Sequence, residues 1–212
     1  MEEQFWQSRW EEGRIAFHEA VPNRCLTQHL PDFSLRTGSQ IFVPLCGKSV
    51  DLDWLLRQGH NVAGVEFNQG AVETVFERMA LTPTVGENKG VRRFQSGRLT
   101  LWQGDLFALK AADIPKVDLI YDRAALVALP AEMRTRYGQH LVELSASAPH
   151  LLVSYTYDQS QMEGPPFSVS KSEIEVIYQD THSLAELSRS AITGPLATRC
   201  SGGEHVWKLT PK

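Results

Sequence analysis

Short apolar segments alternate with amphipathic segments along most of the chain. The apolar segments are short and rich in β-branched and aromatic residues, so we expect buried strands at 40–45, 61–66, 99–103, 117–122 and 151–157. Between them, apolar residues recur at helical spacing, which predicts helices at 50–58, 68–80 and 130–146. Strands that alternate with helices indicate an α/β fold built on a mostly parallel sheet.

Both ends of the chain depart from this alternation. Residues 2–12 and 23–30 are expected to form two short helices inside an N-terminal extension, residues 1–38, which covers the mouth of a site as a lid. Ser172 with Glu175 predicts a capping box for a helix that ends near Gln179. The segment that includes 204–209 should supply a final antiparallel pair of strands.

The segment 82–90 contains Pro83, Gly86 and Gly90 and is expected to be a loop. After it, 91–94 and 99–103 flank a turn and predict a hairpin that leads into the third strand. A chain of 212 residues can bury a substantial core, and we expect one domain, 1–212.

The first strand runs into a short turn that is typical of nucleotide-binding folds. Pro44 has no N–H group and should end the strand, whereas Gly47 permits a tight turn. Ser49 is a suitable N-cap for the helix that follows. A strand, a tight turn and a helix together point backbone N–H groups at a ligand above the turn.

Two common phosphate-binding motifs do not fit this turn. A P-loop would require a glycine at Phe42, where the chain is still a strand. A dinucleotide fingerprint would require glycines at Leu45 and Cys46. A pyrophosphate cradle is therefore not expected.

Glu66 ends the second strand, 66 − 47 = 19 positions after Gly47. An acid at this place can accept hydrogen bonds from the two hydroxyl groups of a ribose. The alternative is that Glu66 and Asn68 only cap the next helix. A nucleoside site without a phosphate cradle indicates S-adenosylmethionine rather than a dinucleotide.

Several strings between residues 5 and 167 resemble those of the thiopurine S-methyltransferase family, bacterial branch. They are Phe5-Trp6-x-x-x-Trp10, Gly13-x-x-x-Phe17-His18, Pro44-Leu45-Cys46-Gly47-Lys48, Gly59-His60, Gly64-Val65-Glu66, Asp122-Arg123-x-Ala125-Leu126-Val127-Ala128 and Gly164-Pro165-Pro166-Phe167. The resemblance implies a Rossmann-like, class I S-adenosylmethionine-dependent methyltransferase. Its sheet would have seven strands, mostly parallel, with helices on both faces and an N-terminal helical cover.

The resemblance also implies positions for the cofactor and the methyl acceptor. The cofactor would contact Trp10, Leu45, Gly47, Glu66, Asp105, Leu106 and Arg123. Of these, Leu45 and Gly47 would lie at the methionine portion, and Asp105 and Leu106 at the adenine. Phe17 and Arg123 would line the acceptor site, and Arg199 is assigned as its second basic residue, beyond the part of the chain that carries the resemblance.

Simpler structural roles are the alternatives for several of these residues. Trp10 belongs to an aromatic stripe that can attach a helix to the domain. Asp105 follows Gly104 and suits a turn. Asp122 and Arg123 can form an ordinary salt bridge at a strand tip. Cys46, at the start of a helix, is either a nucleophile or a small residue that admits the cofactor.

The expected reaction is S-methylation of thiopurines or similar aromatic and heterocyclic thiols, with reduced selenium or tellurium species as further acceptors. The nucleophile would be the thiolate, favoured by Arg123, and no catalytic base is assigned. The alternatives are a halide or thiocyanate methyltransferase, an S-adenosylmethionine-binding module without turnover, and a dinucleotide oxidoreductase.

Composition limits the possible partners. Charged residues make up 22% and the formal net charge is −4, which argues against a nucleic-acid or anionic-membrane binder. Three cysteines suggest reduced thiols, and the N-terminal sequence lacks a signal pattern, so we expect a cytoplasmic monomer that acts on a small-molecule thiol. Cys200 and His205 make only one metal-binding pair, so no metal is expected.

Overall fold

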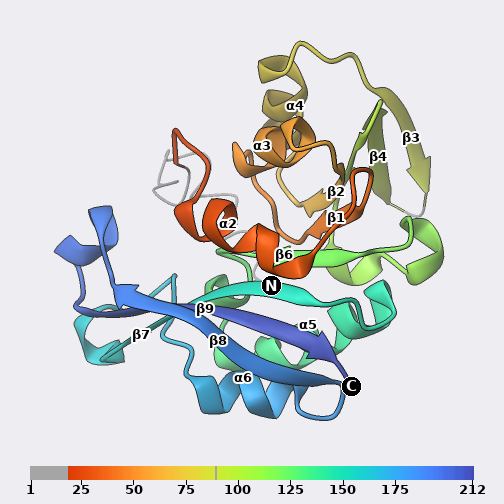
Figure 1. The fold of residues 1–212 in the computed structure, drawn as a ribbon. Helices are drawn as coiled ribbons and strands as arrows, with labels where there is room; N and C mark the ends of the chain where they lie inside the picture. Colours follow the sequence, from red (N-terminus) through yellow and green to blue (C-terminus); the bar gives the residue numbers. More distant parts are fainter. Residues whose placement is uncertain (1–18, 89) are drawn as a thin grey trace.

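The computed structural model describes residues 19–88 and 90–212. The strands are β1 (Gln40–Val43), β2 (Asn61–Glu66), β3 (Thr84–Asn88), β4 (Val91–Ser96), β5 (Leu99–Gln103), β6 (Leu119–Asp122), β7 (His150–Tyr157), β8 (His182–Ala191) and β9 (Gly202–Pro211). They form a single sheet in the order β3-β4-β5-β2-β1-β6-β7-β9-β8 (Figure 1). The expected alternation of strands and helices is therefore present.

Of the helices in the described residues, the first precedes β1 and the others lie between strands. They are α2 (Arg24–His29), α3 (Asp51–Arg57), α4 (Gln69–Arg78), α5 (Ala131–Ser145) and α6 (Lys171–Tyr178), with short 3₁₀ turns that include η1 (Leu30–Phe33), η2 (Leu106–Ala108), η4 (Leu126–Ala128) and η6 (Gly194–Thr198). Among residues 19–88 and 90–212, no helix has the length and apolar character needed to cross a membrane.

The centre of the sheet is parallel, and its two ends are antiparallel. Strands β5, β2, β1, β6 and β7 run parallel to one another. At one end β9 pairs antiparallel with both β7 and β8, which confirms the expected final pair. At the other end β4 pairs antiparallel with β5 and β3.

Within residues 19–88 and 90–212 the sheet has nine strands rather than the seven expected, because β3 and β4 extend one edge. The prediction of a loop at 82–90 was wrong: residues 84–88 form a strand whose Val85 pairs with Phe94. Gly86 weakens the local strand signal, but the backbone hydrogen bonds offered by β4 stabilise the extended conformation at this exposed edge.

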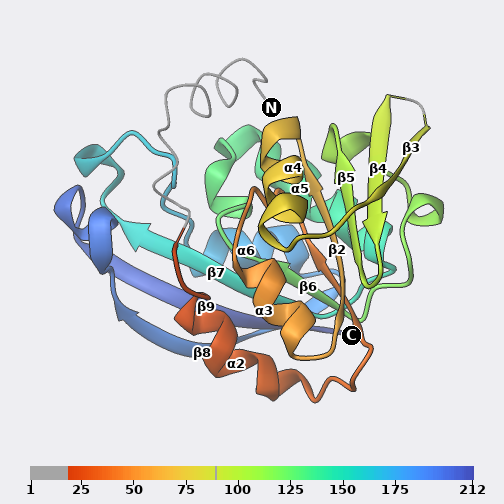
Figure 2. The ribbon, with the colours of Figure 1, turned by 90° about the horizontal axis from the view of Figure 1, so that it is seen from above.

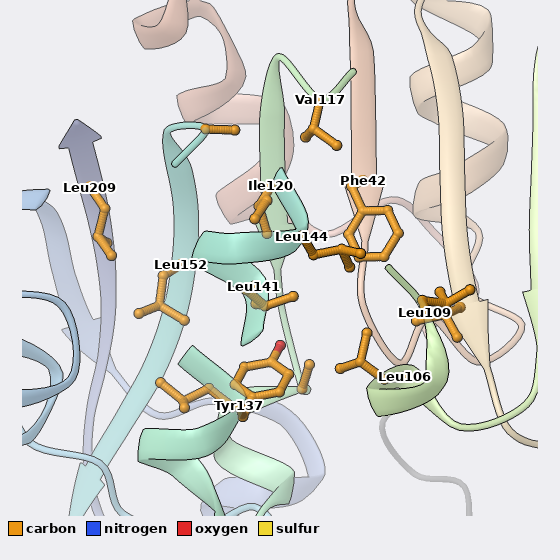
Figure 3. Close-up of a cluster of buried hydrophobic side chains, with 14 of the residues drawn as sticks. Phe42, Leu106, Leu109, Val117, Ile120, Tyr137, Leu141, Leu144, Leu152 and Leu209 are labelled. Atoms are coloured by element: carbon orange, nitrogen blue, oxygen red, sulfur yellow. The ribbon is translucent and has the colours of Figure 1, made fainter. Parts of the chain in front are cut away.

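Helices cover both faces of the sheet, as Figures 1 and 2 show. Helices α2, α3 and α4 pack on one face and α5 and α6 on the other, and each face has its own apolar cluster. Alternate residues of a strand point to opposite faces, so Ile41 and Val43 join the first cluster and Phe42 joins the second. Figure 3 shows the second cluster, in which Tyr137 and Leu141 of α5 approach the sheet.

Two helix starts differ from the predictions. Ser170, and not Ser172, caps α6, since its Oγ accepts from the N–H of Glu173 at 3.2 Å. Val50 occupies the N-cap position of α3, while the Oγ of Ser49 accepts from the N–H of Asp51 at 3.1 Å. Serine spacing alone cannot distinguish adjacent cap registers, because the backbone path decides which hydroxyl meets an N–H group.

Candidate functional site

The parallel strands bring most of the predicted site residues to one edge of the sheet. Their carboxyl ends all lie at this edge, where ligands bind in open α/β sheets. Leu45 and Gly47 follow β1, Glu66 ends β2, Asp105 and Leu106 follow β5, Arg123 follows β6, and Arg199 lies just before β9. The predicted residues Trp10 and Phe17 lie outside the described residues.

The turn after β1 is tightly constrained. Leu45 and Gly47 both have left-handed backbone conformations, with φ of 46° and 53°. For Leu45 this conformation costs roughly 1 kcal/mol, because its Cβ crowds the backbone. The N–H of Cys46 donates to the carbonyl of Val65 at 3.0 Å, which fixes the turn against β2.

Gly64 of β2 lets this turn approach the sheet closely. A Cβ at this position would lie 3.0 Å from Cys46 Sγ, 3.0 Å from Leu101 Cδ2 and 3.1 Å from the carbonyl oxygen of Val43. Close packing at this position therefore explains why the Gly64-Val65-Glu66 string begins with a glycine.

The side chain of Glu66 links the end of β2 to the turn after β1 by accepting hydrogen bonds from backbone N–H groups. Its Oε2 accepts from the N–H of Gly47 at 2.9 Å, and its Oε1 accepts from the N–H of Asn68 at 2.8 Å. Burial raises the pKa of Glu66, although these N–H groups oppose the shift. Each carboxylate oxygen has a second lone pair, so the side chain retains capacity to accept from a hydroxyl group.

The capping alternative for Glu66 is therefore present in the structure. Asn68 is the N-cap of α4 and accepts from the N–H of Ala71 at 2.9 Å. Glu66 supports that cap through the backbone of Asn68. This role and a contact with a ribose use different lone pairs, so the two roles are compatible.

Asp105 and Leu106 begin the turn that follows β5. The exposed Asp105 caps η2, with Oδ1 accepting from the N–H of Phe107 at 3.0 Å, which is the turn role given above as its alternative. Leu106 is buried in the apolar cluster near Tyr137, as Figure 3 shows. At this point of the edge, the exposed polar group is the carboxylate of Asp105.

Asp122 shapes the turn that presents Arg123. It is fully buried, and its two oxygens accept from the N–H of Leu126 at 3.1 Å and from the hydroxyl of Tyr137 at 2.8 Å. Burial raises the pKa of Asp122 to about 6, although both donors oppose the shift. The side chain of Asp122 therefore points to the face of the sheet that α5 covers. Its hydrogen-bond partners there are Leu126 and Tyr137 rather than the neighbouring Arg123.

Arg123 points to the opposite face and contacts two carboxylates. Its Nη2 lies 2.8 Å from Glu19 Oε1, and its Nη1 lies 3.6 Å from Asp51 Oδ2. Burial lowers the pKa of the guanidinium, but the charges of Tyr121, Asp51 and Glu19 outweigh this effect and raise it. The side chain thus stays charged at the tip of β6.

Asp51 is the centre of a buried polar network beside Arg123. Its Oδ1 accepts from the N–H of Asn23 at 2.7 Å, and its Oδ2 accepts from the hydroxyl of Tyr121 at 3.0 Å. Asn23 in turn donates to both carboxylate oxygens of Glu19 at 3.2 and 3.1 Å. This network connects the segment before α2 with the start of α3 and the end of β6.

No sequence pattern predicted four of the residues at this site, Glu19, Asn23, Asp51 and Tyr121. Asp51 and Tyr121 are far apart in sequence and meet only because β1 and β6 are neighbours. Each residue taken alone has an ordinary explanation, such as an acid in the first turn of a helix. No local pattern signals the network.

Arg199 and the loop after β7 border the same edge. Arg199 is exposed at the end of η6. Burial raises the pKa of Tyr157, the last residue of β7, and the charge of Arg199 opposes this shift. The hydroxyl of Tyr157 donates to the carbonyl of Pro166 at 2.6 Å, and the N–H of Phe167 donates to the carbonyl of Val127 at 2.6 Å. The Gly-Pro-Pro-Phe loop is thus attached to the segment that follows Arg123.

The cysteines contribute packing rather than reactivity at this site. Burial raises the pKa of Cys46 well above its usual value, so a thiolate nucleophile there is disfavoured. Its sulfur faces Gly64 inside the protein. Within residues 19–88 and 90–212, the structure brings together no group of three or more side chains suited to a metal ion.

Comparison with known proteins gives a consistent family assignment. The family model of thiopurine S-methyltransferase matches residues 1–210. The thiopurine S-methyltransferase of Xanthobacter autotrophicus is 43% identical over 210 residues, covering 99% of each chain. That of Teredinibacter turnerae is 44% identical over 210 residues, covering 99% of this chain and 98% of its own.

Two solved structures with similar folds are named as methyltransferases. A Burkholderia thailandensis 1,6-didemethyltoxoflavin-N1-methyltransferase with bound S-adenosylhomocysteine has a TM-score of 0.67 and 13% identity, covering 98% of this chain and 87% of its own. A magnesium protoporphyrin IX methyltransferase from Synechocystis, also with bound S-adenosylhomocysteine, has a TM-score of 0.63 and 15% identity, covering 95% and 94%. The predicted Rossmann-like methyltransferase fold is confirmed.

Proposed function

Because the chain belongs to the thiopurine S-methyltransferase family, we propose that it transfers the methyl group of S-adenosylmethionine to the sulfur of a thiopurine or similar aromatic or heterocyclic thiol. The observation that carries the proposal is the family match over residues 1–210, which includes every helix and strand of the described residues except the last residue of β9, Pro211. Reduced selenium and tellurium species are further acceptors in this proposal.

The residues present at the sheet edge fit the cofactor. Glu66 keeps acceptor capacity for ribose hydroxyls while the N–H of Gly47 holds its carboxylate in place. In this proposal Leu45 and Gly47 lie at the methionine portion, and Asp105 and Leu106 lie at the adenine. Trp10 completes the cofactor site from the N-terminal segment.

Arg123 serves both ligands in the proposed site. It stands at the tip of β6, between the turn after β1 and the end of β7. Its permanent charge favours the thiolate over the thiol, and only the thiolate is strongly nucleophilic. Phe17 and Arg199 line the rest of the acceptor site, together with the loop that ends at Phe167.

The protein's contribution to the reaction is mainly positioning. S-adenosylmethionine supplies a methyl group that its sulfonium already activates. The chain's residues then have to align the acceptor sulfur with that methyl group and exclude water. A thiol with a low pKa is ionised near neutral pH, so the proposal assigns no catalytic base.

Calorimetry followed by a methyl-transfer assay tests this function. We expect S-adenosylhomocysteine to bind with micromolar affinity and NAD not to bind, because the turn lacks the dinucleotide glycines. Glu66→Gln should weaken S-adenosylhomocysteine binding about tenfold, since an amide cannot replace a carboxylate that accepts several hydrogen bonds. A radiolabelled methyl group should then appear on thiopurine or related thiol acceptors.

Other outcomes would change the assignment. Cofactor binding without methyl transfer to any thiol, halide or thiocyanate would indicate a non-catalytic binding module. Methyl transfer to halide or thiocyanate alone would show that these anions, and not thiols, are the acceptors. Unchanged affinity in Glu66→Gln would reject the ribose contact.

A further inference from the structure

The ion pair between Arg123 and Glu19 has a consequence for which acceptors can bind. We propose that Glu19 is a specificity-determining residue: its carboxylate occupies the guanidinium face of Arg123 that an anionic group of the acceptor would otherwise contact. An acceptor that carries an additional negative charge then binds by displacing Glu19. The inference rests on the proposed function, since it concerns the acceptor side of the same site.

The charges around Arg123 support this role. One guanidinium faces two carboxylates, at 2.8 Å from Glu19 and 3.6 Å from Asp51. Among the described residues, an additional anionic group of the acceptor therefore meets two carboxylates beside the guanidinium, and its approach is disfavoured while Glu19 stays in place. Removal of one carboxylate leaves Arg123 and Asp51, and an anion of the acceptor can replace the missing partner.

The burial of the three side chains indicates which carboxylate can leave. The side chain of Glu19 is 43% exposed, whereas those of Arg123 and Asp51 are 9% and 2% exposed. Glu19 can move into water at low cost because it is already half solvated. Asp51 cannot, since the backbone of Asn23 and the hydroxyl of Tyr121 hold it in the interior.

Asn23 positions Glu19 without burying it. The side-chain amide of Asn23 donates to both oxygens of Glu19, and its backbone N–H donates to Asp51. Its side-chain oxygen accepts from the N–H of Cys25 at 2.9 Å and caps α2. Glu19 therefore lies over Arg123 in a defined position that it can leave while α2 stays anchored.

The test compares two acceptors in the intact protein. One is an aromatic thiol that carries a ring carboxylate, and the other is the same thiol with an uncharged carboxamide at that position. Glu19→Gln removes one negative charge and keeps the side-chain size. The control variant is Glu77→Gln, which removes an exposed carboxylate from α4.

We expect Glu19→Gln to lower the KM of the carboxylate-bearing thiol about two- to fivefold, the effect of a partly exposed ion pair. The KM of the carboxamide should change less than twofold, because both acceptors share the thiolate and only the carboxylate-bearing thiol brings an additional negative charge that competes with Glu19 for Arg123. The change should fall on KM rather than on kcat. Calorimetry with S-adenosylhomocysteine checks that the variant folds and keeps its cofactor site, and Glu77→Gln should match the wild type throughout.

Three results would overturn the inference. The first is an equal KM change for both thiols, which would indicate a structural effect. The second is a large loss of kcat with both thiols, which would make Glu19 a proton acceptor. The third is wild-type KM values in the variant. If the wild type methylates thiols and one of these results appears, only the inference fails, whereas a wild type that methylates neither thiol removes the proposed function and the inference together.

Discussion

Buried polar residues differ in whether their side-chain atoms have hydrogen-bond partners. Glu66 and Asp122 each accept two hydrogen bonds, so burial at the sheet edge leaves them compatible with the fold. His150 is different: neither of its ring nitrogens has a hydrogen-bond partner among the described residues. It lies at the start of β7, with Tyr178 and His182 at ring-centroid distances of 5.1 and 5.0 Å.

The environment of His150 makes stability depend on pH. Burial, with a smaller effect from the neighbouring His182, lowers its pKa from 6.5 to about 3. The folded protein keeps this ring neutral, while the unfolded chain takes up a proton below pH 6.5. The contribution to stability is therefore complete above pH 6.5 and is lost as pH falls from 6.5 to about 3.

His150→Phe should remove this loss of stability. Between pH 7 and 5 the wild type should lose about 2 kcal/mol through this residue, and the variant should lose that much less. At pH 7 the variant should be more stable by about 1 kcal/mol, because a phenyl ring leaves no unsatisfied polar atom in the same space. Urea unfolding at several pH values measures both effects.

His29→Phe is the matched comparison. His29 Nδ1 lies 2.9 Å from Asp32 Oδ2 and Nε2 lies 2.8 Å from Ser188 Oγ, so this variant loses hydrogen bonds and should be less stable at pH 7. If the free energy of unfolding falls equally with decreasing pH in the wild type and in His150→Phe, then His150 is not the source of the pH dependence.

At the scale of elements, the turn between β1 and α3 depends on β2. Gly64 has no Cβ, and this allows Cys46 to pack against the strand. The sequence predicted the turn correctly from Pro44 and Gly47, because these signals lie within the turn itself, whereas the predicted N-cap at Ser49 was one residue early. It could not predict the contact with Gly64, which exists only after β1 and β2 pair.

Gly64→Ala should displace the turn and weaken cofactor binding. The added methyl group would lie 3.0 Å from Cys46 Sγ and 3.1 Å from the carbonyl oxygen of Val43, closer than ordinary contacts. We expect S-adenosylhomocysteine to bind about tenfold more weakly and the free energy of unfolding to fall by about 1–3 kcal/mol. Calorimetry and urea unfolding measure the two changes.

The control for this substitution is Gly86→Ala in the edge strand β3. No atom lies within 4 Å of a Cβ at Gly86, so affinity should be unchanged and stability should change by no more than about 0.5 kcal/mol. Wild-type affinity in Gly64→Ala would show that the turn does not transmit strain to the cofactor site.

The whole molecule is organised by one continuous sheet. In the described part of the chain, nine strands are hydrogen-bonded in a single order, and apolar clusters on both faces include residues from its central strands. One domain over residues 1–212 stays a prediction. Trp54 on α3, Trp102 on β5 and Trp207 on β9 are spread across the sheet and report on its separate parts.

We therefore expect a single cooperative unfolding transition. Tryptophan fluorescence and far-UV circular dichroism should give the same urea midpoint, because both halves of the sheet unfold together. For a monomer the midpoint should not change over a tenfold range of protein concentration. Two separate transitions would contradict the single domain, and a midpoint that rises with concentration would contradict the monomer.

The sequence by itself determined the alternation of strands and helices, the turn after β1 and the family, because these depend on residues that are adjacent or regularly spaced in the chain. Tertiary structure decided what lies at long range. It added β3 to the edge of the sheet, directed Glu66 to the N–H of Gly47, and placed Arg123 against Glu19 and Asp51. These contacts depend on the order of the strands and on the direction of each side chain, and neither is encoded in a local pattern.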